Sequence, residues 1–251
     1  MSKFEQYLWT VVIIAVVILA YASLTDLSHR LDPVLFPGIG RIWVALLKSF
    51  PELCKDLLSS LLRLLPSYFA ALVAGIGLGL LIGWSATARQ IAAPIFHGLS
   101  PIPPTLYIPY AIAVFPTFWA ASFFLIFIGA FWPVFLGTIR GVVLLEDRYL
   151  DNARMLRLHG WRLLTRVVFP AALPFIFNGA GMALVFSFLL LVVAEMFGTT
   201  WGLGYFIMRS ADFSEYQNVL AGIIFMSVVI VLLMSVFDIL QRKALHWNAK
   251  R

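Results

Sequence analysis

Residues 140–174 read RGVVLLEDRYLDNARMLRLHGWRLLTRVVFPAALP, a polar stretch between long apolar runs. It carries six arginines: Arg140, Arg148, Arg154, Arg157, Arg162 and Arg166. Residues 148–158 contain no proline or glycine, His159-Gly160 offers a helix stop, and WRLLTRVVF then runs to Pro170. The stretch therefore predicts two short helices joined by a turn. Its charge favours either a solvated loop that follows the positive-inside bias or a docking element for a soluble partner.

The composition on either side of this loop is that of a membrane protein. The chain is 62% hydrophobic and 12% charged, and its mean hydropathy is +0.95. A soluble domain has about 45–50% apolar and about 25% charged residues, so a soluble fold is excluded. The net charge of +6 does not indicate a nucleic-acid partner, because the basic residues cluster beside apolar segments. A single cysteine, Cys54, excludes an internal disulfide.

Apolar windows without Asp, Glu, Lys or Arg predict the membrane spans, each of which needs about 20 residues. The windows are Tyr7–Thr25, Leu64–Ala88, Ile91–Ile139, Val167–Ala194 and Tyr216–Phe237. The third is long enough for two spans, with a break at Phe115-Pro116-Thr117. We therefore expect an all-α membrane protein with about six transmembrane helices and a cytoplasmic two-helix loop. The first window reads as a retained span, because no small-residue cleavage pattern follows it.

The distribution of basic residues predicts the orientation. Six spans place both termini on one side, and a cytoplasmic loop then places 12 of the 18 basic residues inside. The inner set is Lys3, Arg89, the six loop arginines, Arg242, Lys243, Lys250 and Arg251. The outer set is Arg30, Arg41, Lys48, Lys55 and Arg209. This is the direction of the positive-inside bias, so we expect both termini to be cytoplasmic.

Two units are expected along the chain. Residues 1–56 hold the first span and an outer amphipathic helix, whose apolar residues fall at helical spacing. Those residues are Ile42, Trp43, Leu46, Leu47 and Phe50. Residues 57–251 form the core, with the loop 140–174 inside it.

Small residues and prolines mark two of the core spans. Gly75, Gly79 and Gly83 lie four residues apart, which predicts close helix–helix approach. Alternatively, glycine is simply frequent in membrane helices. SPIPPTLYIP at residues 100–109 carries four prolines, which predict a break in the third span. That break either lines a translocation path or is a structural kink.

Polar side chains within the apolar windows are candidates for a gate or a pathway. Arg63 and Glu195 are charged, and a pair between the second and fifth spans would form a gate latch or part of the path. The alternative is snorkelling to the outer interface. Asp238 and Arg242 predict a helix-end contact. Candidate pathway residues of neutral polarity are Tyr68, Tyr107, Tyr110, Asn178 and Ser187.

The sequence carries no signature of a catalytic or metal site. It has no GxxxxGK[ST] phosphate loop and no dinucleotide-type glycine loop. Its four histidines share no ligand spacing: His29, His97, His159 and His246. We expect a chain that is not itself an enzyme and that binds no cofactor or metal.

Several segments resemble the permease subunits of ABC importers. Asp151-Asn152-Ala153-Arg154, Trp161-Arg162, Arg166-Val167-Val168 and Pro170-Ala171-Ala172-Leu173-Pro174 resemble their EAA loop. Further matching segments are Ser60–Arg63, Pro101–Pro104, Val193–Met196, Gly202–Tyr205 and Leu245–Trp247. Together they cover residues 33 to 247 and resemble the nitrate/sulfonate/taurine/bicarbonate group of binding-protein-dependent permeases.

The chain departs from the family pattern at several positions. Asp151 replaces the Glu of EAA, Asn152 replaces its first Ala, and Arg157 stands where the family glycine falls, three residues before Gly160. Phe115-Pro116-Thr117-Phe118 replaces a Phe-Gly-x-Gly segment. These changes leave the register of the loop turn open and weaken inference of the substrate.

The resemblance implies an ABC type I importer-like fold and a permease subunit that moves a small polar solute by alternating access. The solute would be an oxyanion, a small organic anion or a nitrogen heterocycle. It also implies two copies of a separate ATPase subunit that holds ATP and Mg, a periplasmic or lipid-anchored solute-binding protein, and a second permease copy, as a homodimer. The ATPase-coupling residues would be Asp151, Asn152, Ala153, Arg154, Leu156, Arg157 and Gly160.

Within that loop, Asp151 can accept a bidentate bond from a partner arginine, and Ala153 would allow close packing. Two rival functions stay open at this point. An ion-coupled secondary transporter would need ionisable groups near the bilayer midplane, of which the spans hold few. A membrane anchor or assembly factor would explain the loop but not the proline-broken span.

Overall fold

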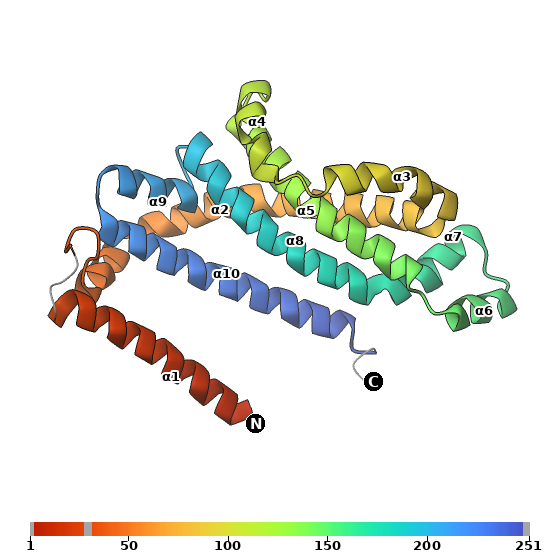
Figure 1. The fold of residues 1–251 in the computed structure, drawn as a ribbon, viewed down its shortest axis with the longest axis horizontal. Coiled ribbons are helices and arrows are strands. Elements are labelled where there is room, and N and C mark those ends of the chain that lie inside the picture. The colour runs from red at the N-terminus through yellow and green to blue at the C-terminus, as the bar shows by residue number, and fades with distance from the viewer. Residues whose placement is uncertain (1–2, 28–31, 248–251) are drawn as a thin grey trace.

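The fold is known from a computed structural model that describes residues 3–27 and 32–247, and every regular element among them is helical (Figure 1). The α-helices are α1 (Lys3–Ala22), α2 (Ile39–Trp84), α3 (Ala86–Leu99), α4 (Ile108–Val114), α5 (Phe118–Val143), α6 (Asp147–Met155), α7 (Gly160–Leu163), α8 (Phe169–Gly198), α9 (Leu203–Asp212) and α10 (Tyr216–Ala244). Two π-helical turns, η1 (Ser23–Leu27) and η3 (Leu164–Val168), and the 3₁₀ turn η2 (Pro104–Tyr107) complete the set. The predicted all-α class is confirmed.

Four helices are long and apolar enough to cross a membrane: α2, α5, the continuous helix Gly160–Gly198 and α10. The third predicted span is divided into α3, η2 and α4, so it is not a single helix. The count of six spans stays a prediction. Three of the basic residues used to predict the orientation lie outside the described part of the chain: Arg30, Lys250 and Arg251. His29, considered as a metal ligand, also lies outside it.

Helix α2 is longer than the sequence suggested. The outer amphipathic helix and the second span form one helix of 46 residues, which runs without a break through the boundary expected between residues 56 and 57. Residues 52–65 contain neither glycine nor proline, so no residue there stops the helix. It ends at Trp84, and the side chain of the next residue, Ser85, accepts a hydrogen bond from the Ala88 N–H (3.2 Å) and caps α3.

Both predicted interruptions around the fourth helix are present. Helix α3 ends at Leu99, and the chain is not helical again until η2 begins at Pro104. The break at residues 115–117 separates α4 from α5, where Thr117 caps α5 by accepting from the Ala120 N–H at 3.2 Å.

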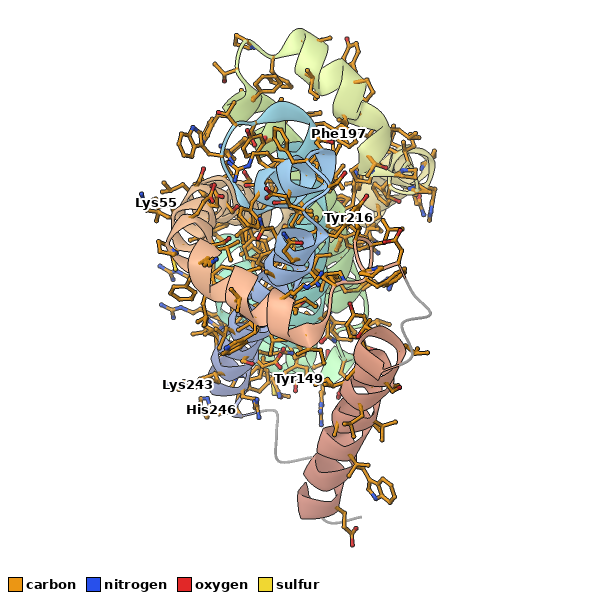
Figure 2. The ribbon with its side chains drawn as sticks, turned by 90° about the vertical axis from the view of Figure 1, so that its left-hand side faces the viewer. Lys55, Tyr149, Phe197, Tyr216, Lys243 and His246 are labelled. Carbon is orange, nitrogen blue, oxygen red and sulfur yellow. The ribbon has the colours of Figure 1, made fainter. Side chains whose placement is uncertain are left out.

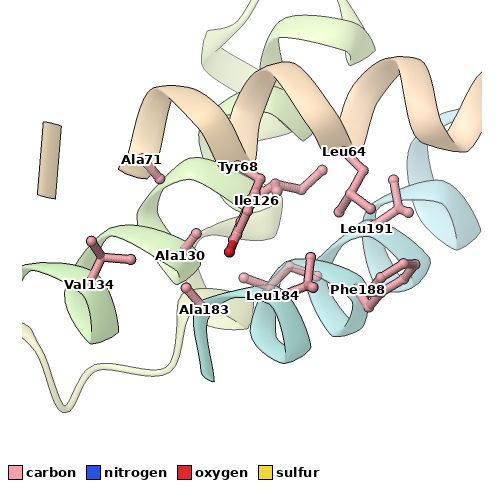
Figure 3. Close-up of a cluster of buried hydrophobic side chains, with 11 residues drawn as sticks. Leu64, Tyr68, Ala71, Ile126, Ala130, Val134, Ala183, Leu184, Phe188 and Leu191 are labelled. Carbon is pink, nitrogen blue, oxygen red and sulfur yellow. The ribbon is translucent and has the colours of Figure 1, made fainter. Parts of the chain in front are cut away.

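The core lies where α5 packs between α2 and α8 (Figure 3). Leu64 and Tyr68 of α2 meet Ile126 and Ala130 of α5 and apolar side chains of α8. The Tyr68 hydroxyl is buried and donates to the Ala180 carbonyl at 2.9 Å. This bond satisfies the one polar atom of that side chain, so Tyr68 serves the core and does not face a pathway.

The glycine stripe of α2 faces α5. A methyl group on Gly79 would lie 2.6 Å from the Thr138 Cβ, and one on Gly75 would lie 2.9 Å from a Val134 methyl. Both glycines and Gly83 are buried, whereas Gly77 has no neighbour within 4 Å of such a methyl group. Close packing therefore explains this stripe better than the general frequency of glycine in membrane helices.

The two ends of the bundle carry different features. Helix α9 and the first turns of α2 lie at one end, and α6 and α7 lie at the other (Figure 1). Helix α1 stands apart from the bundle in both views, with exposed side chains such as Trp9, Ile13 and Val17 (Figure 1 and Figure 2).

Replacing Gly79 with leucine tests the packing of α2 on α5. The larger side chain overlaps Thr138, and overpacking of this kind costs about 1–3 kcal/mol. We expect Gly79→Leu to lower the melting temperature of the purified protein in detergent. Gly77→Leu is the matched control and should melt like the wild type; equal melting of both variants would contradict the close approach.

Candidate functional site

The first candidate site is a buried polar cluster around Glu195, near the end of α8. The Glu195 side chain is 0% exposed and accepts hydrogen bonds from the Ser60 hydroxyl (2.7 Å), the Arg63 guanidinium (3.0 Å) and the Gly204 N–H (2.9 Å). The structure thus contains the ion pair expected between Arg63 and Glu195. We call Glu195, Arg63, Ser60 and Asp56 the Glu195 cluster.

The same cluster caps the start of α9. No side chain at the N-cap of α9 satisfies the free N–H groups of its first turn. Instead, Asp56 accepts from the Gly202 N–H (3.0 Å), the Ser60 hydroxyl accepts from the Leu203 N–H (3.1 Å), and Glu195 accepts from Gly204. Side chains of α2 and α8 therefore fix the position of α9.

Gly202 is required by this arrangement. Its φ of 131° lies in a region that residues with a side chain rarely adopt. A side chain there would also overlap the Glu195 carboxylate. The Gly202–Tyr205 segment is thus needed for the backbone to approach the buried carboxylate.

Arg63 connects the cluster with an open pocket. It also donates to the Trp201 carbonyl (2.8 Å), and its side chain is 13% exposed. The pocket of about 600 Å³ is also lined by Tyr205 and Arg209. Arg209 donates to Glu52 at 2.6 Å, and this bond raises the pKa of the Arg209 guanidinium, which stays charged. Because Arg63 is held by two partners, simple snorkelling does not describe it.

Asp56 and Ser60 were not among the predicted site residues. A signal for them exists, because the polar residues of α2 recur at helical spacing on one face. That stripe is Glu52, Asp56, Ser60, Arg63 and Ser67. In a helix this apolar, such a stripe indicates a buried polar contact.

The second candidate site is the loop around α6, at the opposite end of the bundle. Helix α6 ends at Met155, earlier than the stop expected at His159-Gly160. Arg157 adopts a left-handed φ of 50°, its N–H bonds the Arg154 carbonyl (3.0 Å), and the Leu158 N–H bonds the Ala153 carbonyl (3.0 Å). This is a Schellman motif, in which the position after the cap favours glycine.

The turn register left open by the sequence is therefore fixed. Arg157 occupies the left-handed position, which is the position where the family glycine falls. Gly160 also has a positive φ (56°), but it begins the next helix, α7.

The second helix of the loop is not a separate element. Helix α7 continues through the π-helical turn η3 into α8, so the helix WRLLTRVVF does not end at Pro170. The Phe169 N–H bonds the Leu164 carbonyl five residues earlier, as in a π-helix. This wider turn explains how the chain passes Pro170 without a helix break.

The residues of α6 differ in their exposure. Ala153 is 2% exposed, so it packs α6 against the rest of the chain. Its role in contacts with a partner stays a prediction. Met155 is 83% exposed, and Leu156 and Asp151 are also exposed. Asp151 pairs with Arg154 at 2.9 Å, an exposed contact, while Asn152 is exposed beside them.

The expected pathway residues do not come together. Asn178 is exposed and lines a groove of about 880 Å³ with the proline break at 100–105 and faces of α5 and α8. Ser187 is buried and donates to the Ala183 carbonyl. Tyr107 is half-buried against an apolar cluster, and Tyr110 is exposed on α4. Asp238 and Arg242 form a helix-end contact through the Asp238 carbonyl (3.3 Å).

Among residues 3–27 and 32–247, no group of three His, Cys, Asp or Glu side chains is placed to hold a metal ion. The two candidate sites contain ion pairs, helix caps and an exposed short helix, and they lie at two ends of an apolar bundle.

Residues 42–246 match the family described as binding-protein-dependent transport system inner membrane component. The chain belongs to this family. The match includes the residues of both candidate sites, and the apolar helices agree with an integral protein of the inner membrane.

Similar proteins carry transport names. The chain is 37% identical over 70% of its length to the nitrate import permease protein NrtB of Leptolyngbya laminosa, of which it covers 63%, less than two thirds. It is 36% identical over 70% of its length to the putative aliphatic sulfonates transport permease protein SsuC of Bacillus subtilis, covering 64%. It is 31% identical over 79% of its length to the taurine transport system permease protein TauC of Escherichia coli, covering 72%.

A double-mutant cycle tests the Glu195 cluster. Breaking a buried pair from one side leaves an uncompensated group and costs about 3–5 kcal/mol, whereas removing both charges costs less than the sum. We expect Arg63→Gln and Glu195→Gln to lower the melting temperature strongly and the double variant to fall no further.

The exposed Arg209–Glu52 pair is the control, because such pairs contribute at most about 1 kcal/mol. Additive losses at Arg63 and Glu195 would mean that the two side chains stabilise the protein independently.

The left-handed residue of the loop gives a second test. Arg157→Gly removes the strain of a side chain at positive φ, which is worth about 1 kcal/mol before the entropy of the unfolded chain is counted. We expect slower hydrogen exchange, or no change, in the amides of α6, and faster exchange in Arg157→Val. Arg162→Gly, within the right-handed helix α7, should instead destabilise; the same response at both positions would contradict the Schellman motif.

Proposed function

We propose that this chain is the membrane-spanning permease subunit of an ATP-driven importer. The observation that carries the proposal is α6: a short exposed helix, seated through Ala153 on a bundle of apolar helices and surrounded by arginines. A solvated loop does not need to pack against the bundle. A helix that transmits force to the membrane spans does need such packing.

The partner at this end is an ATPase subunit in two copies, which holds the ATP and Mg that the permease has no motif to bind. Arg148 and Arg154 pair with Glu146 and Asp151. Arg157, Arg162 and Arg166 have no ion-pair partner among residues 3–27 and 32–247. This unbalanced charge favours an acidic surface on the partner. Met155, Asp151 and Asn152 supply the exposed contact face.

At the opposite end, a solute-binding protein delivers the solute, and the Glu195 cluster acts as a latch. The cluster joins α2, α8 and α9, so it holds the middle of α2, the end of α8 and the start of α9 together. In a homodimer, the groove beside Asn178 faces the second copy and contributes to the path. Both termini then lie in the cytoplasm, with α6.

The substrate is proposed to be a small oxyanion or small organic anion. Support comes from the similar proteins named for nitrate, bicarbonate, sulfonates and taurine. A transport assay in proteoliposomes that contain all subunits, with these solutes as competitors, distinguishes among them. Uptake that none of them inhibits would contradict this substrate class.

Reversing the charge of Asp151 tests the docking role. Asp151 is exposed, so Asp151→Lys should insert and fold like the wild type. It removes an acceptor for a partner arginine and places a like charge against that arginine, so we expect about tenfold less ATPase subunit in the copurified complex and loss of uptake.

Asp32→Lys, an exposed change in the segment before α2, is the control and should leave copurification intact. The proposed function fails if no ATPase subunit copurifies with the wild type when neighbouring genes are coexpressed.

A further inference from the structure

A small groove adjoins α6 and brings together three distant parts of the chain. Its volume is about 290 Å³. We call it the Trp247 groove and define it by Tyr149, Asn152, Leu156, Arg166, Pro170 and Trp247. Tyr149 and Asn152 come from α6 and Leu156 caps its end, whereas Arg166 comes from the π-helical turn, Pro170 from the start of α8, and Trp247 follows α10. The end of the last helix therefore reaches the coupling loop.

Helix geometry determines which side chains line the Trp247 groove. Tyr149, Asn152 and Leu156 lie three and four residues apart, so they share one side of α6. Arg166 lies within η3, and π-helical turns are rare and often mark functional sites. Trp247 is 44% exposed and Leu156 is 72% exposed, so apolar surface is open to a partner.

The charged residues that line the groove indicate which chemical groups a partner needs in order to bind there. Its lining contains one cation, Arg166, and no carboxylate. Arg166 has no ion-pair partner within the described chain, and neither does the nearby Arg157. The complementary group is an apolar side chain with a carboxylate beside it. The small volume suits one large side chain better than the acyl chain of a lipid, which needs a longer apolar channel.

We infer that the ATPase subunit inserts an apolar side chain, flanked by a carboxylate, into the Trp247 groove, as a second contact beside the exposed face of α6. The inference rests on the proposed function. One wall of the groove belongs to α6 itself, so a subunit that seats on α6 reaches the groove from the same side. Two contacts resist rotation of α6 about its axis, and they connect the end of α10 to the partner.

The test uses the complete complex of permease and coexpressed ATPase subunit in nanodiscs. The affinity of the ATPase subunit is measured for Trp247→Ala, Trp247→Phe and Arg166→Ala, over a range of salt concentrations. We expect Trp247→Ala to bind about tenfold more weakly, as truncation of a buried aromatic anchor commonly does, and Trp247→Phe to restore most of the affinity. Arg166→Ala should bind more weakly and lose part of the salt dependence.

Trp43→Ala, an exposed change near the start of α2, is the matched control and should bind like the wild type. The inference is overturned if Trp247→Ala and Arg166→Ala keep wild-type affinity while Asp151→Lys loses it. The ATPase subunit would then bind α6 without using the groove. It is also overturned if the anionic lipid content of the nanodisc, and not the ATPase subunit, determines the effect of these variants. If the wild type binds no ATPase subunit, the proposed function itself is contradicted.

Discussion

The buried carboxylate of Glu195 imposes the strictest requirement in the molecule. A charged group out of water costs several kcal/mol even after the protein relaxes, on the order of the stability of a whole domain, unless donors surround it. Here the donors come from a hydroxyl and a guanidinium of α2 and an N–H of α9. These helices must therefore keep one relative position whenever the carboxylate is buried. A change of that position requires either new donors or access of water to Glu195.

Away from this cluster, close packing of the helices holds the bundle together. Lipid tails are as apolar as the side chains that face them, so burial against lipid does not drive helices together. Close approach of small residues does, and α5 makes it on two sides. Gly79 of α2 lies against Thr138, and a methyl group on Gly179 of α8 would lie 2.5 Å from the Pro133 carbonyl. The exposed large residues of α10, such as Val231 and Leu232, are then free to face lipid.

The sequence predicted the helices well, because charge-free windows and prolines report directly on the spans and their interruptions. It also identified Arg63 and Glu195, since charges in such windows are rare enough to require partners. It did not reveal the continuity of α2, because an amphipathic segment followed by an apolar one looks like two helices.

The loop was predicted less well, for reasons of backbone conformation. Nothing in the residue type of Arg157 indicates a left-handed conformation, and nothing around Pro170 indicates a π-helical turn. The burial of Ala153 depends on which side of α6 meets the bundle, and a helix of nine residues with mixed polarity does not reveal this.

The unbroken helix from Gly160 to Gly198 has a mechanical consequence. It is a rod with the arginine-rich turn near one end and Glu195 near the other. The 29 residue steps from Arg166 to Glu195 span about 44 Å at 1.5 Å per step, so a tilt of about 5° would move the far end by about 4 Å. That displacement exceeds the length of a hydrogen bond. A small swing at the end that carries the arginine-rich turn is thus amplified by leverage into a rupture at the Glu195 end, with no signal passing through intermediate side chains.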